Sequence, residues 1–366
     1  MSPRSRKNAL SQFNVMVVGY SGVGKTSFVR TLVEALKLEM SKERRDSFIK
    51  QSTETKNQLD GPLCKTSEPY TVTVDVEVAG EKMALTLIDT PGFQTDYLVD
   101  KQLHDILGYI EHQFDLALAE ENKVKRNPKA VDTQVHACLY FIDPTKRSLG
   151  EYDIRILTRL SKRVNVIPVI GKADMLTRAQ RNRLKPAILQ SIYTEHKIPL
   201  YGMPAEEEEG DEEEEEEGEE NGADEGEKKM NGTTGSSLEE FLQQFNYEEE
   251  DEESQAFIDY LQLVPFTVIA YEDDPVTGRP VEVEGTEGIK IGRDYGWGSI
   301  DCMNDRYSDF NQLKDILLTT HRGFLKTETV ERYYEEYRTE RLLIKRATKM
   351  KSMDLSKKIL EDLTQI

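Results

Sequence analysis

The chain has 366 residues and a formal net charge of −20, with 68 Asp or Glu against 48 Lys or Arg. Residues 205–254 hold 24 acidic residues and two lysines, so this segment accounts for 22 of the negative charges and the rest carries about +2. The overall acidity therefore does not exclude a folded surface that attracts anions. With 37% apolar residues, the chain can form one large or two ordinary domains.

The three cysteines, Cys64, Cys138 and Cys302, are widely spaced and form no CxxC pair. This pattern supports neither a disulfide framework nor a zinc site and fits a reducing compartment best. No apolar run approaches the roughly 18 residues that span a bilayer. The basic residues 1–8 lead into a strand rather than into a signal-peptide core. We therefore expect a soluble, cytoplasmic protein.

Up to residue 196, short apolar runs alternate with segments of helical periodicity, which predicts a doubly wound α/β sheet. The expected strands are residues 13–18, 70–78, 83–88, 137–142 and 166–170, with the second and third paired as a hairpin. The expected helices are residues 26–38, 97–118, 150–162 and 177–196.

The composition changes sharply at residue 205. Residues 205–235 form a Glu/Gly tract that cannot bury enough apolar surface to become ordered, and a short helix could follow at 237–245. The apolar run at 264–270 predicts the last buried strand. Residues 310–366 are expected to be mostly helical. The expected organisation is a basic leader (1–12), one domain (13–343) interrupted by an acidic disordered insert (205–254), and a short basic, amphipathic C-terminal helix (344–366).

Residues 19–26, Gly-Tyr-Ser-Gly-Val-Gly-Lys-Thr, match the phosphate-binding motif GxxxxGK[ST] between a predicted strand and a predicted helix. Glycines at these positions let backbone N–H groups curl around phosphate. Lys25 would bridge the terminal phosphates, and the Thr26 hydroxyl would bind Mg²⁺ at the helix N-terminus. The alternative is a glycine-rich turn that only joins the strand to the helix.

A second motif, Asp89-Thr90-Pro91-Gly92, follows the predicted strand 83–88. A carboxylate at the C-terminal end of this strand would lie beside the phosphate loop and could hold a Mg²⁺-bound water, while Gly92 could offer its N–H to a terminal phosphate. Alone, this motif could be a simple turn, but each of the two motifs supports the other.

A third motif, Gly171-Lys172-Ala173-Asp174, ends the predicted strand 166–170. The Asp174 carboxylate can accept both the ring N–H and the exocyclic amine of guanine, a pairing that adenine cannot offer, while the Lys172 stem covers the base. The three motifs in order therefore favour GTP over ATP, with an ordinary surface loop at 171–174 as the alternative.

With these motifs the chain resembles the septins, the filament-forming GTP-binding proteins, over roughly residues 13–343 apart from the acidic insert. The further matches are DTPGF at 89–93, YIEHQF at 109–114, VHACLYFI at 135–142, VNVIPVIGKADMLT at 164–177, GRDYGWG at 292–298, SDF at 308–310, His321, and YEEYRTERL at 334–342. The resemblance implies an α/β P-loop GTPase fold, three-layered and doubly wound with a mostly parallel sheet, and a septin-unique C-terminal extension at about 285–343.

The resemblance also implies which residues contact the nucleotide. These are Gly19, Ser21, Gly22, Val23, Gly24, Lys25, Thr26, Ser27, Gly92, Lys172, Asp174, Ala270 and Arg293. Arg293 falls where septins stack an arginine on the base. Counted back from Asp89, Thr66 falls where hydrolysing septins carry a switch I threonine that helps to position Mg²⁺ and the attacking water, although a merely local turn at Thr66 is the alternative. Thr26, Thr66 and Asp89 would then hold Mg²⁺, and Lys25 and Thr66 would act in catalysis.

Some positions depart from the septin pattern. Gln94 and Thr95 stand where switch II usually has Gly and Asp, which affects the expected hydrolysis rate more than nucleotide binding. The other departures are Ala270 and Arg147, where septins usually have Gly and often His, and Gly171 and Gly296, where they have Ala and Pro.

Two charged segments allow two interpretations each. The acidic insert is either a solvated linker or a tract that competes for basic surfaces and so makes assembly depend on salt. The apolar pattern at the C-terminus falls short of a coiled coil and favours a helix docked on the surface, with a helix that touches lipid or a partner as the alternative.

We therefore expect a septin subunit that binds GTP or GDP with Mg²⁺ and hydrolyses GTP slowly, if at all. It would join other septin subunits, as a homo- or hetero-oligomer, in filaments at the cell cortex or division site. Contact with an anionic membrane stays open because the leader and the C-terminal segment are basic, and no nucleic-acid partner is expected. The rival functions are a monomeric signalling GTPase and a nucleotide-bound scaffold without catalysis.

Overall fold

The computed structural model describes residues 11–40, 61–78, 80–94, 96–123, 131–203, 251–281 and 291–364, without the side chains of residues 96, 253 and 352–364. The basic leader up to residue 10, the acidic tract with the helix considered at 237–245, and Thr95 lie outside these residues. Within the described helices, none is long and apolar enough to cross a membrane.

A six-stranded sheet forms the centre of the molecule, in the order β2-β3-β1-β4-β5-β6. Its strands are β1 (Ser11–Gly19), β2 (Tyr70–Val78), β3 (Glu81–Asp89), β4 (Ala137–Ile142), β5 (Val166–Ile170) and β6 (Phe266–Thr267). All neighbouring strands run parallel except β2, which pairs antiparallel with β3 at the edge. The predicted mostly parallel α/β sheet is confirmed.

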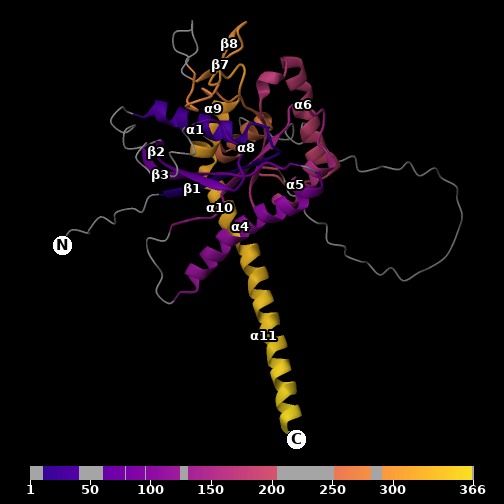
Figure 1. Ribbon diagram of the computed structural model, residues 1–366. Coiled ribbons are helices and arrows are strands. Elements are labelled where there is room, and N and C mark those ends of the chain that lie inside the picture. The colour runs from indigo at the N-terminus through magenta and orange to yellow at the C-terminus, as the bar shows by residue number, and fades with distance from the viewer. Residues whose placement is uncertain are drawn as a thin grey trace, which may run out of the picture.

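Helices cover both faces of this sheet, with α1 on one face and α4 and α5 on the other (Figure 1). The helices before the acidic tract are α1 (Lys25–Glu39), α4 (Val99–Glu121), α5 (Glu151–Leu160) and α6 (Arg178–Gln190), which continues as a π-helical turn (Ser191–Glu195). Because both faces are covered, β4 and β5 are buried at every residue, whereas the edge strand β2 alternates between buried and exposed positions.

The sixth strand is shorter than predicted, since only two of the residues 264–270 pair with β5. The C-terminal region supplies side chains to the other side of this segment. Asp309 accepts from the Thr267 N–H at 2.8 Å, and the Ser308 hydroxyl accepts from the Ile269 N–H at 3.2 Å. Side chains thus replace a neighbouring strand, which the sequence pattern could not indicate.

Helix α8 (Glu252–Leu263) corrects the boundary predicted for the acidic insert. The Asp251 carboxylate caps this helix by accepting from the Ser254 N–H at 2.8 Å, and Tyr260 and Leu261 are buried in the core. The last residues assigned to the insert therefore belong to an ordered helix, whose capping signal was hidden in a run of acidic residues.

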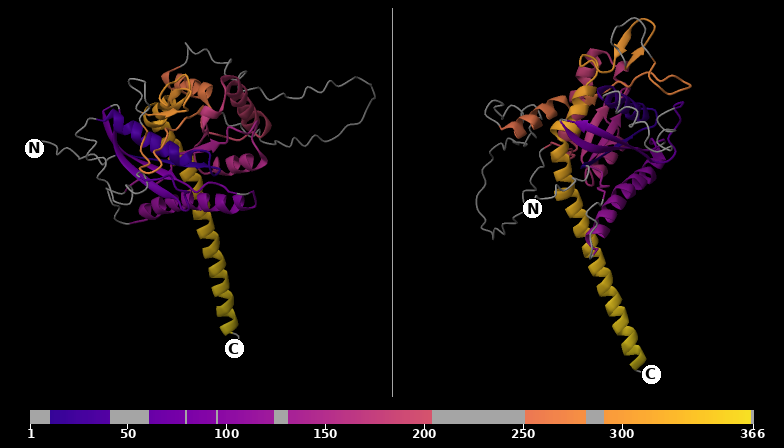
Figure 2. Two further views of the ribbon diagram at one scale, coloured as in Figure 1. Left: turned by 45° about the horizontal axis from the view of Figure 1, so that its top comes forward. Right: turned by 90° about the vertical axis from the view of Figure 1, so that its left-hand side faces the viewer.

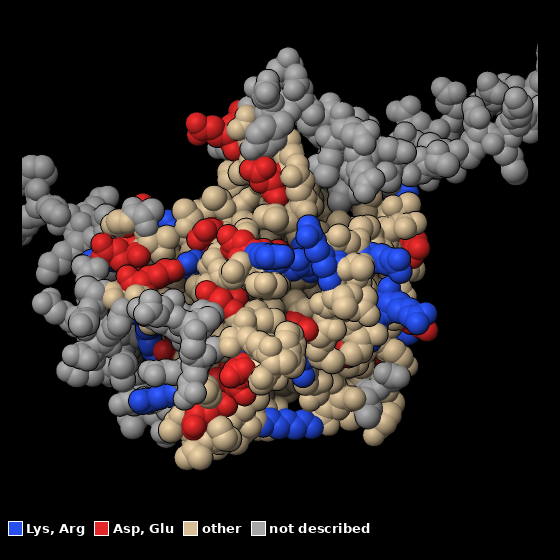
Figure 3. All heavy atoms as spheres, turned by 90° about the horizontal axis from the view of Figure 1, so that it is seen from above, with Lys and Arg blue, Asp and Glu red and all other residues tan. Residues whose placement is uncertain are grey.

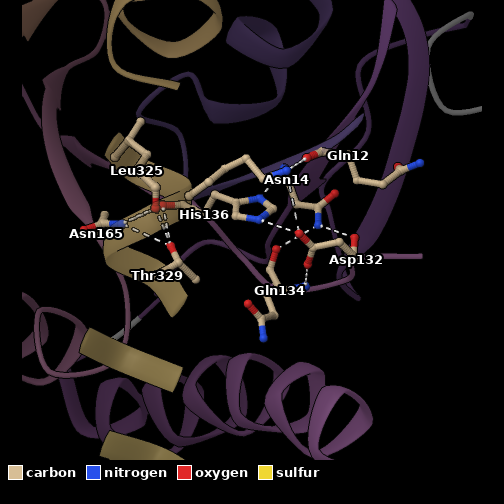
Figure 4. A network of polar contacts seen from close by, with 9 residues as sticks. Gln12, Asn14, Asp132, Gln134, His136, Asn165, Leu325 and Thr329 are labelled. Carbon is tan, nitrogen blue, oxygen red and sulfur yellow. Dashed lines mark hydrogen bonds and ion pairs between the residues drawn. The ribbon is translucent and has the colours of Figure 1, made fainter. Parts of the chain in front are cut away.

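The C-terminal segment is helical, as predicted, in three pieces. They are α9 (Phe310–Asp315), α10 (Arg322–Glu328) and α11 (Glu335–Thr364), joined through π-helical turns at Ile316–Thr320 and Thr329–Tyr334. A buried polar network ties this segment to the sheet (Figure 4). The Asn165 amide donates to the backbone oxygens of His136 and Leu325, each at 3.0 Å, and to the Thr329 hydroxyl at 3.2 Å.

Helix α11 leaves the body of the molecule as a single projecting helix (Figures 1 and 2). Its first turns are held by ion pairs such as Arg163 with Glu340 at 2.7 Å. Beyond them, Leu342, Leu343 and Ile344 are exposed on consecutive positions. The expected docking of the C-terminal helix at 344–366 is not seen, because the helix projects and the side chains of residues 344–351 are exposed. The apolar side chains at 355–366, on which that expectation was based, lie outside the description.

Candidate nucleotide-binding site

The loop between β1 and α1 has the backbone that the phosphate motif requires. Gly22 and Gly24 have φ values of 84° and 100°, in the left-handed region that favours glycine, and Gly24 caps the N-terminus of α1. A Cβ on Gly19 would lie 2.5 Å from the backbone oxygen of Phe141. The loop therefore turns tightly and directs the N-terminus of α1 into the cavity beside it.

This cavity has a volume of about 340 Å³ and lies between the loop and the ends of neighbouring strands. It is lined by Ser21, Gly22, Gly24, Lys25, Thr26, Ser27, Leu63, Cys64, Lys65, Thr66, Thr90, Gly92 and Lys172. Most of the residues predicted to contact phosphate are among them. Gly19 and Val23 do not line this cavity, although the Gly19 backbone oxygen accepts a hydrogen bond from Lys25.

The Lys25 ammonium lies where an anion would be held. Its Nζ donates to the backbone oxygens of Gly19 at 3.0 Å and Tyr20 at 2.8 Å. Burial lowers the pKa of Lys25 to about 8, although the Asp89 carboxylate opposes this shift. A phosphate at this position would be an anionic partner for the buried Lys25 ammonium.

Three side-chain oxygens meet at the inner end of the cavity. The Asp89 Oδ2 accepts from the hydroxyls of Thr26 at 2.6 Å and Thr66 at 3.2 Å, and the two hydroxyl oxygens are 3.3 Å apart. Asp89 is fully buried, burial raises its pKa, and its Oδ1 accepts no hydrogen bond from the described residues.

These oxygens fit Mg²⁺, which prefers oxygen ligands and is usually held by one or two carboxylates together with substrate phosphates. In the described part of the chain, no group of three or more His, Cys, Asp or Glu residues could hold a metal ion. Phosphate oxygens of a bound nucleotide would therefore have to complete the coordination. The structure thus places Thr66 beside Thr26 and Asp89, as the alignment by counting predicted.

Tyr70 is a further residue of this region that the sequence analysis missed. It is paired with Asp89 in the register of the β2–β3 hairpin. Burial raises the pKa of the Tyr70 phenol, and the Asp89 carboxylate raises it further. The signal was available, because the register of a predicted hairpin identifies which residues lie opposite one another.

The loop after β3 is joined to the phosphate loop by backbone hydrogen bonds. The Ser21 N–H donates to the Phe93 oxygen at 2.9 Å, and the Phe93 N–H donates to the Gly19 oxygen at 3.2 Å. A Cβ on Gly92 would lie 2.6 Å from the Ser21 nitrogen and 2.9 Å from the Lys25 Nζ, so only glycine fits. The side chain of Gln94 is exposed, and no described contact directs it toward the cavity.

The second end of the site is a small pocket of about 30 Å³ next to the third motif. It is lined by Gly24, Ser27, Phe28, Phe141, Gly171, Lys172, Asp174, Val268, Ala270 and Arg293. Gly24, Ser27 and Lys172 line both cavities, so the two ends form one continuous site. The four residues predicted to surround the base, Lys172, Asp174, Ala270 and Arg293, are brought together here.

The Asp174 carboxylate is only partly satisfied. Its Oδ2 accepts from the Tyr295 hydroxyl at 2.8 Å, whereas its buried Oδ1 has no hydrogen-bond partner among the described residues. A buried acceptor without a partner is costly, and a donor from a ligand would satisfy it. Guanine offers such donors. The contact with Tyr295 was not predicted, because Tyr295 lies 121 residues away in the sequence.

One departure from the septin pattern has a structural explanation. A Cβ on Gly171 would lie 2.2 Å from the backbone oxygen of Val23 and 3.1 Å from Phe141 Cδ1. The phosphate loop therefore packs against the third motif too closely for the usual alanine. A second departure is also explained, because Gly296 has a φ of 75°, which the usual proline cannot adopt. For Arg147 the structure gives no such explanation.

Arg293 lies on β7 (Gly292–Asp294), which pairs with β8 (Ser299–Asp301) in a small separate sheet. Its guanidinium is 6.0 Å from the centre of the Tyr295 ring, and Tyr295 stacks on Trp297 with ring centres 5.5 Å apart. Trp297 is 82% exposed. The base end of the site thus continues to the molecular surface through a row of aromatic rings.

Comparison with known proteins agrees with this geometry. The septin family model matches residues 10–223 and 230–351. The chain is 32% identical over 332 residues to Septin-12 of Rattus norvegicus, covering 90% of this chain and 75% of that one. It is 31% identical over 329 residues to the septin homolog spn3 of Schizosaccharomyces pombe, covering 90% and 72%.

Other relatives are longer. Septation protein 7 of Candida albicans is 33% identical over 357 residues, covering 90% of this chain but 48% of its own length, so the chain spans about half of some relatives. The septin GTPase domain from Chlamydomonas reinhardtii shares the fold, with a TM-score of 0.53 at 20% identity over 90% of this chain and 99% of that one. The family match covers most of the chain, and the protein belongs to the septin family.

Proposed function

We propose that this protein is a septin subunit that binds GTP or GDP together with Mg²⁺. The observation that carries the proposal is the continuity of the site. Gly24, Ser27 and Lys172 line both cavities, with the hydroxyl and carboxylate oxygens around Asp89 at one end and the half-satisfied carboxylate of Asp174 at the other. A guanine nucleotide has complementary chemistry at both ends.

In this proposal each group of site residues has its own role. Lys25 neutralises phosphate charge, the N–H groups at the start of α1 bind phosphate oxygens, and Asp174 binds the guanine edge. Thr26, Thr66 and Asp89 would hold Mg²⁺, which when bound would neutralise charge that develops on the phosphates. Thr66 would also orient the attacking water. Because Gln94 is exposed, we expect hydrolysis to be slow.

The nucleotide content of the purified protein tests the binding proposal. Denaturation should release GDP or GTP in amounts close to one per chain, detected by ion-exchange chromatography. A protein that releases neither, and that also fails to take up GTP after stripping, would contradict the proposal.

Single-turnover hydrolysis separates an enzyme from a scaffold. We expect Thr66→Ala to slow hydrolysis about tenfold to a hundredfold, because its hydroxyl lies beside the Thr26 hydroxyl and the Asp89 carboxylate at the inner end of the cavity. The matched control is Thr71→Ala, the same change at an exposed position on β2 that does not line the cavity. Equal rates in the wild type and in both variants would remove Thr66 from the mechanism, whereas no measurable hydrolysis in the wild type would favour the scaffold.

We further propose that the subunit joins other septins in filaments at the cell cortex or division site. Light scattering with and without related septins tests this, since a strict monomer in every nucleotide state would favour the rival, a monomeric switch. Acidic and basic side chains alternate across the face seen in Figure 3 rather than forming one basic field, so this face does not favour nucleic acid. Contact with an anionic membrane through the basic segments stays a proposal.

A further inference from the structure

A buried arginine connects three segments that are far apart in the sequence. Arg30 lies on α1, five residues after Lys25, and is only 4% exposed. Its Nη1 donates to the backbone oxygen of Gly61 at 3.0 Å and lies 3.7 Å from the Asp273 carboxylate. None of these residues belongs to the three nucleotide motifs.

The turn that follows Asp273 is shaped to receive Gly61. The Gly61 N–H donates to the Thr277 oxygen at 2.6 Å. Gly278 has a φ of 68°, and a Cβ there would lie 2.0 Å from the Gly61 oxygen and 2.5 Å from the Arg30 Nη1. Only glycine at position 278 therefore allows the arginine, the turn and Gly61 to approach this closely.

The turn itself is fixed by internal hydrogen bonds. The Asp274 Oδ1 accepts from the N–H groups of Val276 at 3.0 Å and Thr277 at 2.6 Å, and from the Thr277 hydroxyl at 2.9 Å. Tyr271 anchors the turn to α1, because its N–H donates to the Thr31 hydroxyl at 3.2 Å. Gly61 thus rests on a turn that is held by its own hydrogen bonds and by its contact with α1.

The contact between Arg30 and Gly61 lies next to segments that line both ends of the site. Gly61 precedes the segment 63–66, which lines the larger cavity and ends at Thr66. Ala270, immediately before Tyr271, lines the smaller pocket. Only four residues separate Gly61 from Thr66, so fixing the position of Gly61 limits where Thr66 can lie.

We propose that Arg30, Asp273 and Gly278 form a clamp that holds Gly61 and thereby positions Thr66 at the Mg²⁺ and phosphate end of the site. Arg30 is then a positioning residue, which acts through the segment 61–66 without touching the nucleotide. This inference rests on the proposed nucleotide binding. It implies that loss of the clamp weakens the Mg²⁺-dependent part of GTP affinity and leaves the Mg²⁺-independent part unchanged.

The test compares GTP affinity in Mg²⁺ with affinity in EDTA for the full chain. In Arg30→Met we expect the gain in affinity from Mg²⁺ to fall about tenfold. The matched control is Arg163→Met, which breaks partly buried ion pairs with Glu111 and Glu340 away from the cavity and should leave the gain unchanged. If folded Arg30→Met protein gains as much GTP affinity from Mg²⁺ as the wild type does, the clamp proposal is wrong.

A second pair of variants separates the clamp from the charge of Arg30, which also influences Tyr70 beside Asp89. Asp273→Asn and Gly278→Ala keep the arginine but disturb its contacts, so both should lower the gain from Mg²⁺ in the same direction. If Arg30→Met fails to fold, these variants decide the question. Unchanged gains in both would contradict the proposal.

Hydrogen exchange distinguishes failure of the clamp from failure of nucleotide binding. In nucleotide-free protein, Arg30→Met should speed exchange of the Gly61 amide, which donates to the Thr277 oxygen, by about tenfold or more, because Gly61 loses its support. Wild-type protein that binds no guanine nucleotide would contradict the proposed function, whereas exchange unchanged by the mutation would contradict the clamp itself.

Discussion

The two ends of the site differ in how far they are formed in this structure. The phosphate end is open, with about 340 Å³ of space, and its donors and acceptors already converge. The base end keeps only about 30 Å³, close to the volume of one water molecule, and the Tyr295 hydroxyl occupies one oxygen of Asp174. The difference indicates that the phosphate end is preorganised, while the β7 segment must shift before a purine can enter.

The largest effect is expected from a mutation at the preorganised phosphate end. Lys25→Met should weaken binding of both GTP and GDP at least a hundredfold, because a buried charge opposite the phosphates is lost. The same change should stabilise the nucleotide-free protein at pH 7 by up to ~3 kcal/mol, since burial holds the pKa of Lys25 near 8 rather than 10.5 and charging it there is costly. Titration calorimetry and denaturant unfolding measure the two effects.

The stability effect has a definite pH dependence. Between about pH 8 and 10.5 the unfolded chain binds more protons at Lys25 than the folded chain, so the cost of its burial is present below pH 8 and is relieved as the pH rises through this window. The advantage of Lys25→Met should therefore shrink above pH 8. An advantage independent of pH would contradict this account of Lys25.

Nucleotide affinity should depend on pH in the opposite sense. Bound phosphate favours the charged ammonium, so above about pH 8 binding requires the uptake of a proton. GTP affinity should be constant below pH 8 and then fall by up to tenfold for each pH unit, measured by titration across this range. Lys25→Arg, which stays charged, should bind more weakly but lose this dependence.

The smallest effect is expected from a mutation at the base end of the site. If the Tyr295 hydroxyl must release Asp174 before the base enters, Tyr295→Phe should speed GTP association about twofold to fivefold in stopped-flow measurements. If the hydroxyl instead holds Asp174 in its binding position, association should slow and GTP should lose part of its preference over inosine triphosphate. The second result would contradict the inference that this end opens.

The phosphate end could be predicted from the sequence because its parts are local. The motif at 19–26 combines strand, glycine turn and helix in one continuous stretch, and Asp89 follows directly from the end of its strand. Thr66 follows less directly, because only the resemblance to septins, counted back without gaps from Asp89, pointed to it.

The remaining features depend on contacts between distant segments. The hydrogen bond from Tyr295 to Asp174 and the ion pair of Arg30 with Asp273 have no local pattern that would reveal them. Helix α8 was hidden by the charge of its first residues, and α11 projects although its sequence suggested a docked helix. Composition and periodicity describe how a segment behaves alone, and these outcomes depend on what it packs against.

The central claim is that one continuous site selects a guanine nucleotide. The most direct measurement is calorimetric titration of nucleotide-stripped protein with GTP and with ATP, both in Mg²⁺. We predict GTP binding with one site per chain and ATP binding at least a hundredfold weaker, because adenine cannot satisfy the Asp174 carboxylate. Equal affinity for the two nucleotides, or binding of neither, would contradict the account.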